Sequence, residues 1–524
     1  MQKDQKKAGI VISYMDMAFS AVIGIFFTPF AQRMMGMSEY GVYTIATAAI
    51  GYLTMLDLGF TNAMVRFTAK SRAEQNTDRE YRINGMFLTF YSIIAVLSVI
   101  VGLILYFNFD GIFAEGLNAH EIGRAKIIFL VMLINTAFSF PMSVFSSIVN
   151  AYEEFVFLKG FSMVTNIAKY VAQILVLFSG FQSVGLAVAV TVVTMVSKFV
   201  PLIFCFKKLH VRFYFGHFDK RLFGDIMNYS AFVFLNIIVD QLNSNTDKMV
   251  LGALVSSGAT AIYNTAYMLQ SGIYSLSSSI SGVFLPSLTK MVTLKKGMDE
   301  ISDVFIKVGR IQFMILAFVM GGFAVFGQRF VHLWVGDEYS LVYLIVLLWL
   351  AYSIFPLSQS VGVSILQAQN KHRVRSLIYL VIAVFHVLLT IGLSKEGSVL
   401  GEENRILGPT VAACFSNLLG QWLTMNLYYK FVTKIDMGGY WKEVLKIAAV
   451  IASYTLVGGF VVHFIPLDQG MAASGIGAWA ALLGAIAVYS LLFIPVAWKL
   501  MLSPFEKDMV LGVIKKLRGA LHRK

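Results

Sequence analysis

The stretch NIIVDQLNSNTDKMVLG, residues 236–252, is polar on one side of a helix and apolar on the other. At about 100° per residue, Asn236, Asp240, Asn243 and Asp247 form one stripe, because they follow one another at spacings of four, three and four. The opposite side carries apolar side chains: Ile238, Val239, Leu242, Met249 and Val250. The pattern predicts a helix whose back faces lipid or protein and whose front faces water or polar partners.

The rest of the chain predicts a membrane protein. Its 524 residues are 57% hydrophobic and 14% charged, with a mean hydropathy of +0.72, whereas soluble proteins carry about 25% charged residues. Runs of about 20 apolar residues, each long enough to cross a bilayer, recur along the whole length. They predict an all-α polytopic fold with about fourteen spans, near residues 8–30, 41–63, 84–108, 127–149, 161–180, 185–206, 224–247, 261–285, 308–327, 341–365, 377–394, 409–428, 447–465 and 475–498.

Basic residues indicate how these helices are oriented. The net charge is +13, and most of the 42 Lys and Arg fall in loops on the N-terminal side of the predicted membrane. Cytoplasmic loops are rich in Lys and Arg, so we expect both termini to be cytoplasmic. This explains the charge without nucleic acid as a partner.

Motifs of enzymes and metal sites are missing from the sequence. Cys205 and Cys414, the two cysteines, lie inside apolar runs, which excludes a disulfide framework and a cysteine zinc site. The sequence has no GxxxxGK[ST], HExxH, DxD, DDxxD or GxSxG pattern. We therefore expect no catalytic residues, no metal and no organic cofactor, and we do not expect an enzyme.

Two similar segments indicate an internal repeat. Tyr43 in RMMGMSEYGVYTIATA and Tyr263 in KMVLGALVSSGATAIYNTA each follow a basic residue, a glycine and a short loop with serine. The two tyrosines lie 220 residues apart, and about six spans fill this offset. We expect two six-helix lobes, residues 1–222 and 223–430, around a central hydrophilic cavity, with a further helix pair and tail in 431–524.

The tail, residues 503–524, predicts a basic amphipathic helix. Ser503 and Glu506 match a capping box, and Pro504 occupies the first helical position. Apolar residues then recur at helical spacing, opposed by Lys515, Lys516 and Arg518. Such a helix either lies on the anionic inner leaflet or packs against the cytoplasmic loops of the same chain.

Polar residues inside predicted spans need water or one another, because a charge at the bilayer centre costs about 2.5–3.5 kcal/mol on insertion scales. The stripe in 236–252 therefore lines a water-filled cavity or forms a polar cluster that joins helices. Other spans repeat the pattern, and amide and aromatic side chains suit sugars. The candidates for the polar cavity lining are Asn166, Gln173, Asn236, Asn243, Asn264 and Tyr267. Ordinary interhelical hydrogen bonding is the alternative.

Four basic residues are candidates for binding an anion in this cavity: Lys169, Lys198, Lys248 and Arg66. Lys169 lies too deep in its span to reach the interface, whereas Lys198 can also extend to the cytoplasmic surface. Lys248 has the alternative role of anchoring the outer interface, and Arg66 has the alternative of an ion pair with Asp57.

Acidic residues within spans are candidates for ion coupling. Asp240, Asp247 and Asp16 are the residues expected to bind a coupling ion, either Na+ or H+. His386 is a further lone ionisable group in a predicted span.

Several motifs resemble those of a known family. TPF…GMSEYGVY…LDLGF…VRFTAK, then NTDKMVLG…AIYNTAYML…LPSLTK, and then LQAQNKHR resemble the bacterial polysaccharide flippases. These belong to the multidrug/oligosaccharidyl-lipid/polysaccharide exporter superfamily, and the resemblance covers roughly residues 1–430. It implies two lobes, alternating access, and transfer of a polyprenyl-diphosphate-linked oligosaccharide from the inner to the outer leaflet of the bacterial cytoplasmic membrane. It assigns no site residues.

Other functions remain open from the sequence. The extra helix pair favours, within the family, a flippase for the peptidoglycan precursor or for spore-envelope assembly. A cation-coupled multidrug exporter, a non-transporting scaffold of a polysaccharide assembly complex and a glycosyltransferase are alternatives, and the short loops argue against the last. The expected partners are the lipid-linked substrate, membrane lipids, and a polysaccharide polymerase and glycosyltransferases.

Overall fold

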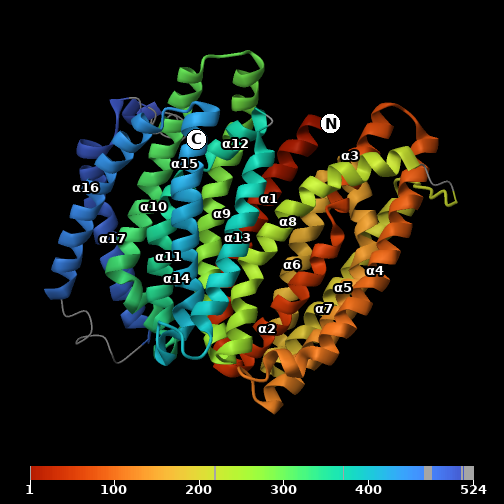
Figure 1. Cartoon of the computed structure of the whole chain (residues 1–524), viewed down its shortest axis with the longest axis horizontal. Helices are drawn as coiled ribbons and strands as arrows, with labels where there is room; N and C mark the ends of the chain where they lie inside the picture. Colours follow the sequence, from red (N-terminus) through yellow and green to blue (C-terminus); the bar gives the residue numbers. More distant parts are fainter. Residues whose placement is uncertain are drawn as a thin grey trace, which may run out of the picture. The chain divides into compact units, whose positions relative to one another are not determined.

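The computed structural model describes residues 2–216, 220–369, 371–464, 475–504, 506–508 and 511–512. Within these ranges the chain is built from helices and contains no strand (Figure 1). The predicted all-α membrane fold is therefore confirmed.

The first eight α-helices are α1 (Gln2–Met35), α2 (Met37–Thr54), α3 (Phe60–Ala73), α4 (Thr77–Phe113), α5 (Ala119–Ala151), α6 (Phe155–Phe178), α7 (Gln182–Lys207) and α8 (Lys220–Leu254). The remaining α-helices are α9 (Ser257–Thr293), α10 (Met298–Val335), α11 (Leu341–Ser358), α12 (Val361–Ala368), α13 (His372–Ser394), α14 (Gly408–Asn417), α15 (Met425–Tyr428), α16 (Met437–Phe464) and α17 (Gly475–Val496). Three π-helical segments continue α14, α15 and α17: η4 (Leu418–Thr424), η5 (Tyr429–Thr433) and η6 (Ala497–Met501).

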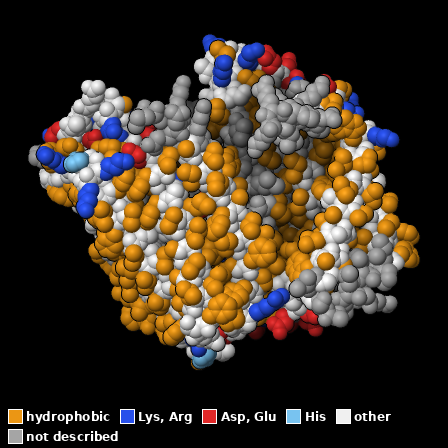
Figure 2. All heavy atoms as spheres, turned by 180° about the vertical axis from the view of Figure 1, so that it is seen from behind, with side chains coloured by type: hydrophobic (Ala, Val, Ile, Leu, Met, Phe, Trp, Pro, Cys, Tyr) orange, Lys and Arg blue, Asp and Glu red, His pale blue; other side chains and the backbone are white. Residues whose placement is uncertain are grey.

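Twelve helical segments in the described part of the chain are long and apolar enough to cross a membrane. They correspond to twelve of the predicted spans. The other two, 261–285 and 409–428, fall in α9 and in the run from α14 to η5, which are helical but are not among these twelve. The count of fourteen therefore stays a prediction. Figure 2 shows many hydrophobic side chains on the outer sides of the helices. So many exposed apolar side chains are stable in contact with lipid and not with water.

Local signals in the sequence set helix ends. Asn118 and Glu121 form a reciprocal capping box at the start of α5. The span from Met37 to Ala73 is interrupted after the 3-10 turn η1 (Met55–Asp57), because Leu58 and Gly59 both adopt left-handed backbone conformations, with φ of 52° and 78°. This break separates α2 from α3.

The chain divides into two compact units. The first contains residues 1–268 and 373–416, and the second contains 269–372 and 417–524. This division differs from the expected lobe boundary at 222/223, since α8, the first third of α9 and most of α13 group with the N-terminal helices. The six-plus-six arrangement of lobes stays a prediction.

Side-chain contacts join the loops of the first unit at each of the two ends of its helices. At one end, Arg124 of α5 is paired with Glu39 of α2 and donates to Gln182 at the start of α7. At the other end, Tyr152 after α5 donates to Glu80 of α4. Burial raises the pKa of the Tyr152 phenol, and the hydrogen bond to Glu80 raises it further. Figure 1 shows α4, α5 and α7 running side by side between these ends. Successive loops therefore alternate between the two ends of the helices, as the predicted topology requires.

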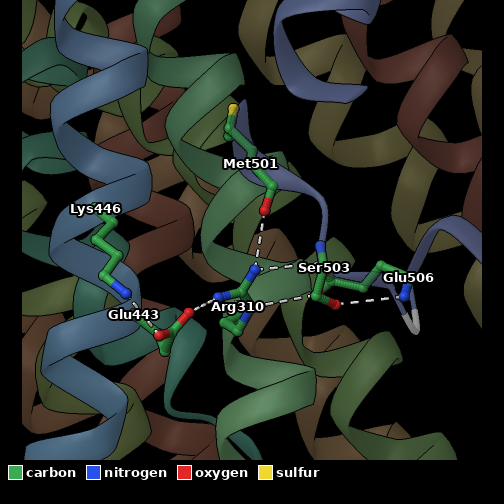
Figure 3. Close-up of polar contacts among 6 residues, drawn as sticks. All are labelled: Arg310, Glu443, Lys446, Met501, Ser503 and Glu506. Atoms are coloured by element: carbon green, nitrogen blue, oxygen red, sulfur yellow. Dashed lines mark hydrogen bonds and ion pairs between the residues drawn. The ribbon is translucent and has the colours of Figure 1, made fainter. Parts of the chain in front are cut away.

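An ion-pair cluster holds the C-terminal helices in the second unit (Figure 3). Arg310 of α10 is 8% exposed and contacts both oxygens of Glu506 at 3.3 Å and the carbonyl of Met501 at 2.9 Å. It also pairs with Glu443 of α16, whose other oxygen accepts from Lys446 at 3.1 Å. Three segments far apart in the sequence are thus fixed at one guanidinium.

The predicted capping box at Ser503 is confirmed. The Ser503 amide donates to Glu506 at 2.7 Å, the Glu506 amide donates to the Ser503 hydroxyl at 3.4 Å, and Pro504 is the first helical residue. Residues 513–524 lie outside the described residues, so both interpretations of the basic tail stay predictions.

Candidate functional site

A buried group of hydrogen-bonded side chains surrounds Asp247 in the first unit. Asp247 of α8 and His386 of α13 are 3% and 5% exposed, and His386 Nε2 lies 2.9 Å from Asp247 Oδ1. The Tyr263 hydroxyl of α9 donates to Oδ2, and the Thr390 hydroxyl of α13 lies 3.4 Å from Oδ1. The carboxylate of α8 is therefore held by side chains of two other helices, α9 and α13, and is shielded from solvent.

Lys248 extends this buried group. Its side chain is buried, and the ammonium lies 4.0 Å from the centre of the Tyr267 ring of α9. A cation over an aromatic face is favourable when both are desolvated. Two of the residues predicted to face the cavity are thus in contact with each other.

The rest of the α8 stripe differs from Asp247. Asn236, Asp240 and Asn243 are exposed, whereas Val239 on the opposite side is buried. Asn236 accepts a hydrogen bond from Ser376 at 3.0 Å, and the positive charge of Arg375 acts on Asp240. The polar face of this helix is therefore divided: an exposed part between 236 and 243, and a buried part at 247.

A second group of predicted residues lies on α1, α6 and α7. Asn166 of α6 donates to both oxygens of Asp16 of α1, at 3.1 and 3.3 Å. Gln173, two turns along α6, is buried. Lys169 and Lys198 are half-buried, and within the described ranges neither has a hydrogen-bond or ion-pair partner. They lie on α6 and α7, which pack against each other.

The two remaining candidates have separate partners. Asn264 of α9 donates to the Tyr40 hydroxyl of α2 at 3.0 Å. Arg66 of α3 is exposed and lies over the ring of Tyr229, with its guanidinium 4.6 Å from the ring centre.

Asp57, which the sequence suggested as the partner of Arg66, instead accepts hydrogen bonds from Thr61 and Tyr91 at 2.7 Å each. An ion pair between Asp57 and Arg66 is not among the contacts of the described residues.

The sequence missed several functional contacts because their partners are distant along the chain. His386 was an isolated ionisable group, and its partner Asp247 lies 139 residues away. Thr390 is one helical turn from His386, which was the available signal for a shared polar face. Glu121 lies between the predicted spans 84–108 and 127–149, and it accepts hydrogen bonds from Ser38 and Ser257. Across the part of the chain that is described, no cluster of three His, Cys, Asp or Glu could hold a metal ion.

Long apolar helices with ionisable groups buried between them define a polytopic membrane transporter. The family model described as "Polysaccharide biosynthesis protein" matches residues 7–292, more than half of the sequence. The chain belongs to this family, and the resemblance to the polysaccharide flippases is confirmed.

Curated relatives of similar length support this assignment. The chain is 22% identical over 530 residues to the "Uncharacterized membrane protein EpsK" of Bacillus subtilis (strain 168), covering 96% of this chain and 97% of the relative. It is 20% identical over 430 residues to a "Putative O-antigen transporter" of Shigella flexneri, covering 78% and 94%.

Solved structures share the fold. A lipid II flippase, MurJ, in an inward closed conformation gives a TM-score of 0.69 at 15% identity, covering 92% of this chain and 98% of that chain. An inward-facing multidrug transporter of the MATE family gives a TM-score of 0.59 at 14% identity, covering 80% and 97%. The chain therefore shares the fold of these two transporters.

Proposed function

We propose that this protein moves a polyprenyl-diphosphate-linked oligosaccharide from the inner to the outer leaflet of the bacterial cytoplasmic membrane by alternating access. The observation that carries the proposal is the pair Lys169 and Lys198, which are half-buried within membrane helices and lack partners among the described residues. Membership of the polysaccharide biosynthesis family supports the same class of cargo.

The physical argument concerns charge. Removing an ammonium from water costs several kcal/mol unless an opposite charge compensates it, and two such groups close together repel each other. A diphosphate between Lys169 and Lys198 would relieve both penalties. Lysine suits a transporter, because its ammonium is a flexible point charge that can release the anion again.

The neighbouring amides suit the sugars. Gln173 and Asn166 lie on the same helix as Lys169, and Asp16 beside Asn166 adds an acceptor. Sugar hydroxyls need donors and acceptors of this kind. A cationic drug is the less favourable cargo, since the unpaired charges here are positive.

We assign the proposed coupling ion to the Asp247–His386 pair and favour H+ over Na+. A carboxylate beside an imidazole can share a proton, and the imidazole is a poor ligand for Na+, which prefers oxygen donors. Among the described residues, Lys248, Tyr263 and Tyr52 are the other titratable groups that face this pair. Asp240 and Asp16 are the alternative coupling residues.

Proteins that share this fold suggest the alternative functions. A peptidoglycan-precursor or spore-envelope flippase would use the same pair of lysines, because those cargoes also carry a lipid diphosphate. A scaffold role would make both lysines dispensable. We propose cytoplasmic termini, and a polymerase and glycosyltransferases as partners.

The test is flipping in proteoliposomes that contain a defined lipid-linked oligosaccharide, read by exposure of the sugar to a membrane-impermeant glycosidase. Lys169→Ala and Lys169→Gln should abolish flipping, Lys169→Arg should retain part of it, and Lys198→Ala should reduce it less. Lys126→Ala is the matched control, because Lys126 is already paired with Asp110 at 2.5 Å.

Folded yield in the membrane is measured on the same samples. Loss of folded protein in Lys169→Ala, rather than loss of turnover, would mean that this lysine joins helices. Unchanged flipping by a well-folded Lys169→Ala would refute the assignment, and a lipid II cargo flipped in preference to other oligosaccharides would select the peptidoglycan alternative.

A further inference from the structure

One carboxylate joins three helix starts at the end of the first unit that is predicted to face outside. Glu121 Oε1 accepts hydrogen bonds from Ser257 at the start of α9, at 2.6 Å, and from Ser38 at the start of α2, at 2.5 Å. Its other oxygen accepts the Asn118 amide at 3.0 Å within the capping box of α5. Both serines lie in the first compact unit, on opposite sides of the predicted lobe boundary at 222/223.

Backbones approach unusually closely beside this carboxylate. A Cβ atom added at Gly41 of α2 would overlap the carbonyl oxygen of Ser257, and one added at Gly116 before α5 would overlap the carbonyl oxygen of Gly252 in α8. Glycine is the residue that permits such contact. Helices on the two sides of the predicted lobe boundary therefore approach closely at this end, where Ile45 of α2 also packs on Gly252.

Polar contacts continue along the same line. The Tyr52 hydroxyl of α2 is hydrogen-bonded to Thr246 of α8, and Asn264 of α9 donates to Tyr40 of α2. Thr246 is the residue next to Asp247, so the proposed coupling pair lies directly beside this line of contacts. We use the name outer seam for this contact. Its one side is formed by α2 and the start of α5, and its other side by the adjoining ends of α8 and α9.

The chemistry of the outer seam is suited to opening. Its hydrogen bonds are few and directional, and water can replace the Ser38 hydroxyl at Glu121 because Ser38 is exposed, whereas Ser257 is buried. Hydrogen bonds to a charged acceptor are also stronger than neutral ones, so a single carboxylate can hold the seam closed.

We infer that Glu121, with Ser38 and Ser257, is a latch that holds the outer seam closed until cargo is released outward. Glu121 is a positioning residue, which acts on the helix starts and does not touch cargo. The inference rests on the proposed function in one respect: alternating access requires that this end open.

The test is side-specific labelling of Asn264→Cys, in a Cys414→Ser background, by a membrane-impermeant thiol reagent added outside. Glu121→Ala should raise the labelling rate at least tenfold, since the loss of a hydrogen bond to a charged group exceeds the roughly 1.4 kcal/mol that corresponds to a factor of ten. Glu121→Gln keeps an acceptor oxygen and should raise it less.

Asn118→Ala is the matched control, because it removes the capping box and leaves both serine contacts of Glu121 in place. Labelling unchanged in Glu121→Ala, or raised equally in Asn118→Ala, would overturn the latch.

A cross-link tests the latch even if Glu121→Ala does not fold. Ser38 and Ser257 donate to the same oxygen, so Ser38→Cys/Ser257→Cys should form an oxidative cross-link that stops flipping until a reductant is added. Cross-linked protein that still flips at the normal rate would refute the latch. Labelling needs no cargo, so the expected labelling together with no flipping by the unmodified chain would refute the proposed function alone.

Discussion

Replacing Arg310 with alanine is expected to destabilise the second unit more than any other single change in the cluster of Figure 3. The guanidinium is buried and supplies the charged partner of Glu506, which is 2% exposed. Removing one member of a buried ion pair leaves an uncompensated charge and costs about 3–5 kcal/mol.

The loss of stability expected for Arg310→Ala can be divided between the two carboxylates, Glu443 and Glu506. Glu443 keeps Lys446 as a partner at 3.1 Å when Arg310 is lost, whereas among the described residues Glu506 keeps the Ser503 contacts of its own capping box alone. Most of the cost therefore falls on Glu506. Glu443→Gln should cost about 1 kcal/mol, the value of a typical hydrogen bond.

The assay is thermal unfolding in detergent, followed by the loss of the monodisperse peak in fluorescence-detected size exclusion. The order of stability should be Arg310→Ala lowest, then Arg310→Lys, then Glu443→Gln. The double variant Arg310→Met/Glu506→Met should recover most of the loss, because removing both charges of a buried pair is often nearly neutral. A double variant as unstable as Arg310→Ala, or a fully stable Arg310→Ala, would refute the reasoning.

Three further predictions use the same structure. Burial raises the pKa of the Glu506 carboxyl, but hydrogen bonds from Arg310 and Ser503 and the charge of Arg310 outweigh this and hold the pKa below its usual value. The stability that the cluster contributes should therefore be complete at neutral pH and decrease below about pH 4. Unfolding measured against pH should show this decrease in the unmodified chain and not in Glu506→Gln. Cysteines at Asp240 and Asn243 should react with small aqueous thiol reagents, whereas cysteines at Asp247 and Val239 should be protected, and uniform reactivity would contradict the division of the α8 face. Cysteines at Lys208 and Lys371 should resist an impermeant reagent added outside intact cells, and labelling there would reverse the predicted orientation.

Hydropathy predicted the helices because each span must satisfy its own backbone hydrogen bonds and present apolar side chains to lipid. The same argument selected Lys169 and Asp247, because a charged side chain within such a span needs water or a polar partner. It could not assign partners, which depend on helix packing: Asn166 and Asp16 lie 150 residues apart. Nor could it find Glu121, because a carboxylate in a short loop is unremarkable until two other helix starts are brought against it.

The left-handed turn at Leu58 and Gly59 has a mechanical consequence. An unbroken helix from Met37 to Ala73 would behave as a stiff rod, and any tilt at the outer seam would move Arg66 at its far end by a proportionate amount. The turn works as a joint in this rod, because regular helical hydrogen bonding stops there and Gly59 packs against Val233 of α8. The two ends of this span can therefore change their tilt one at a time, which is the freedom that the proposed alternating access needs.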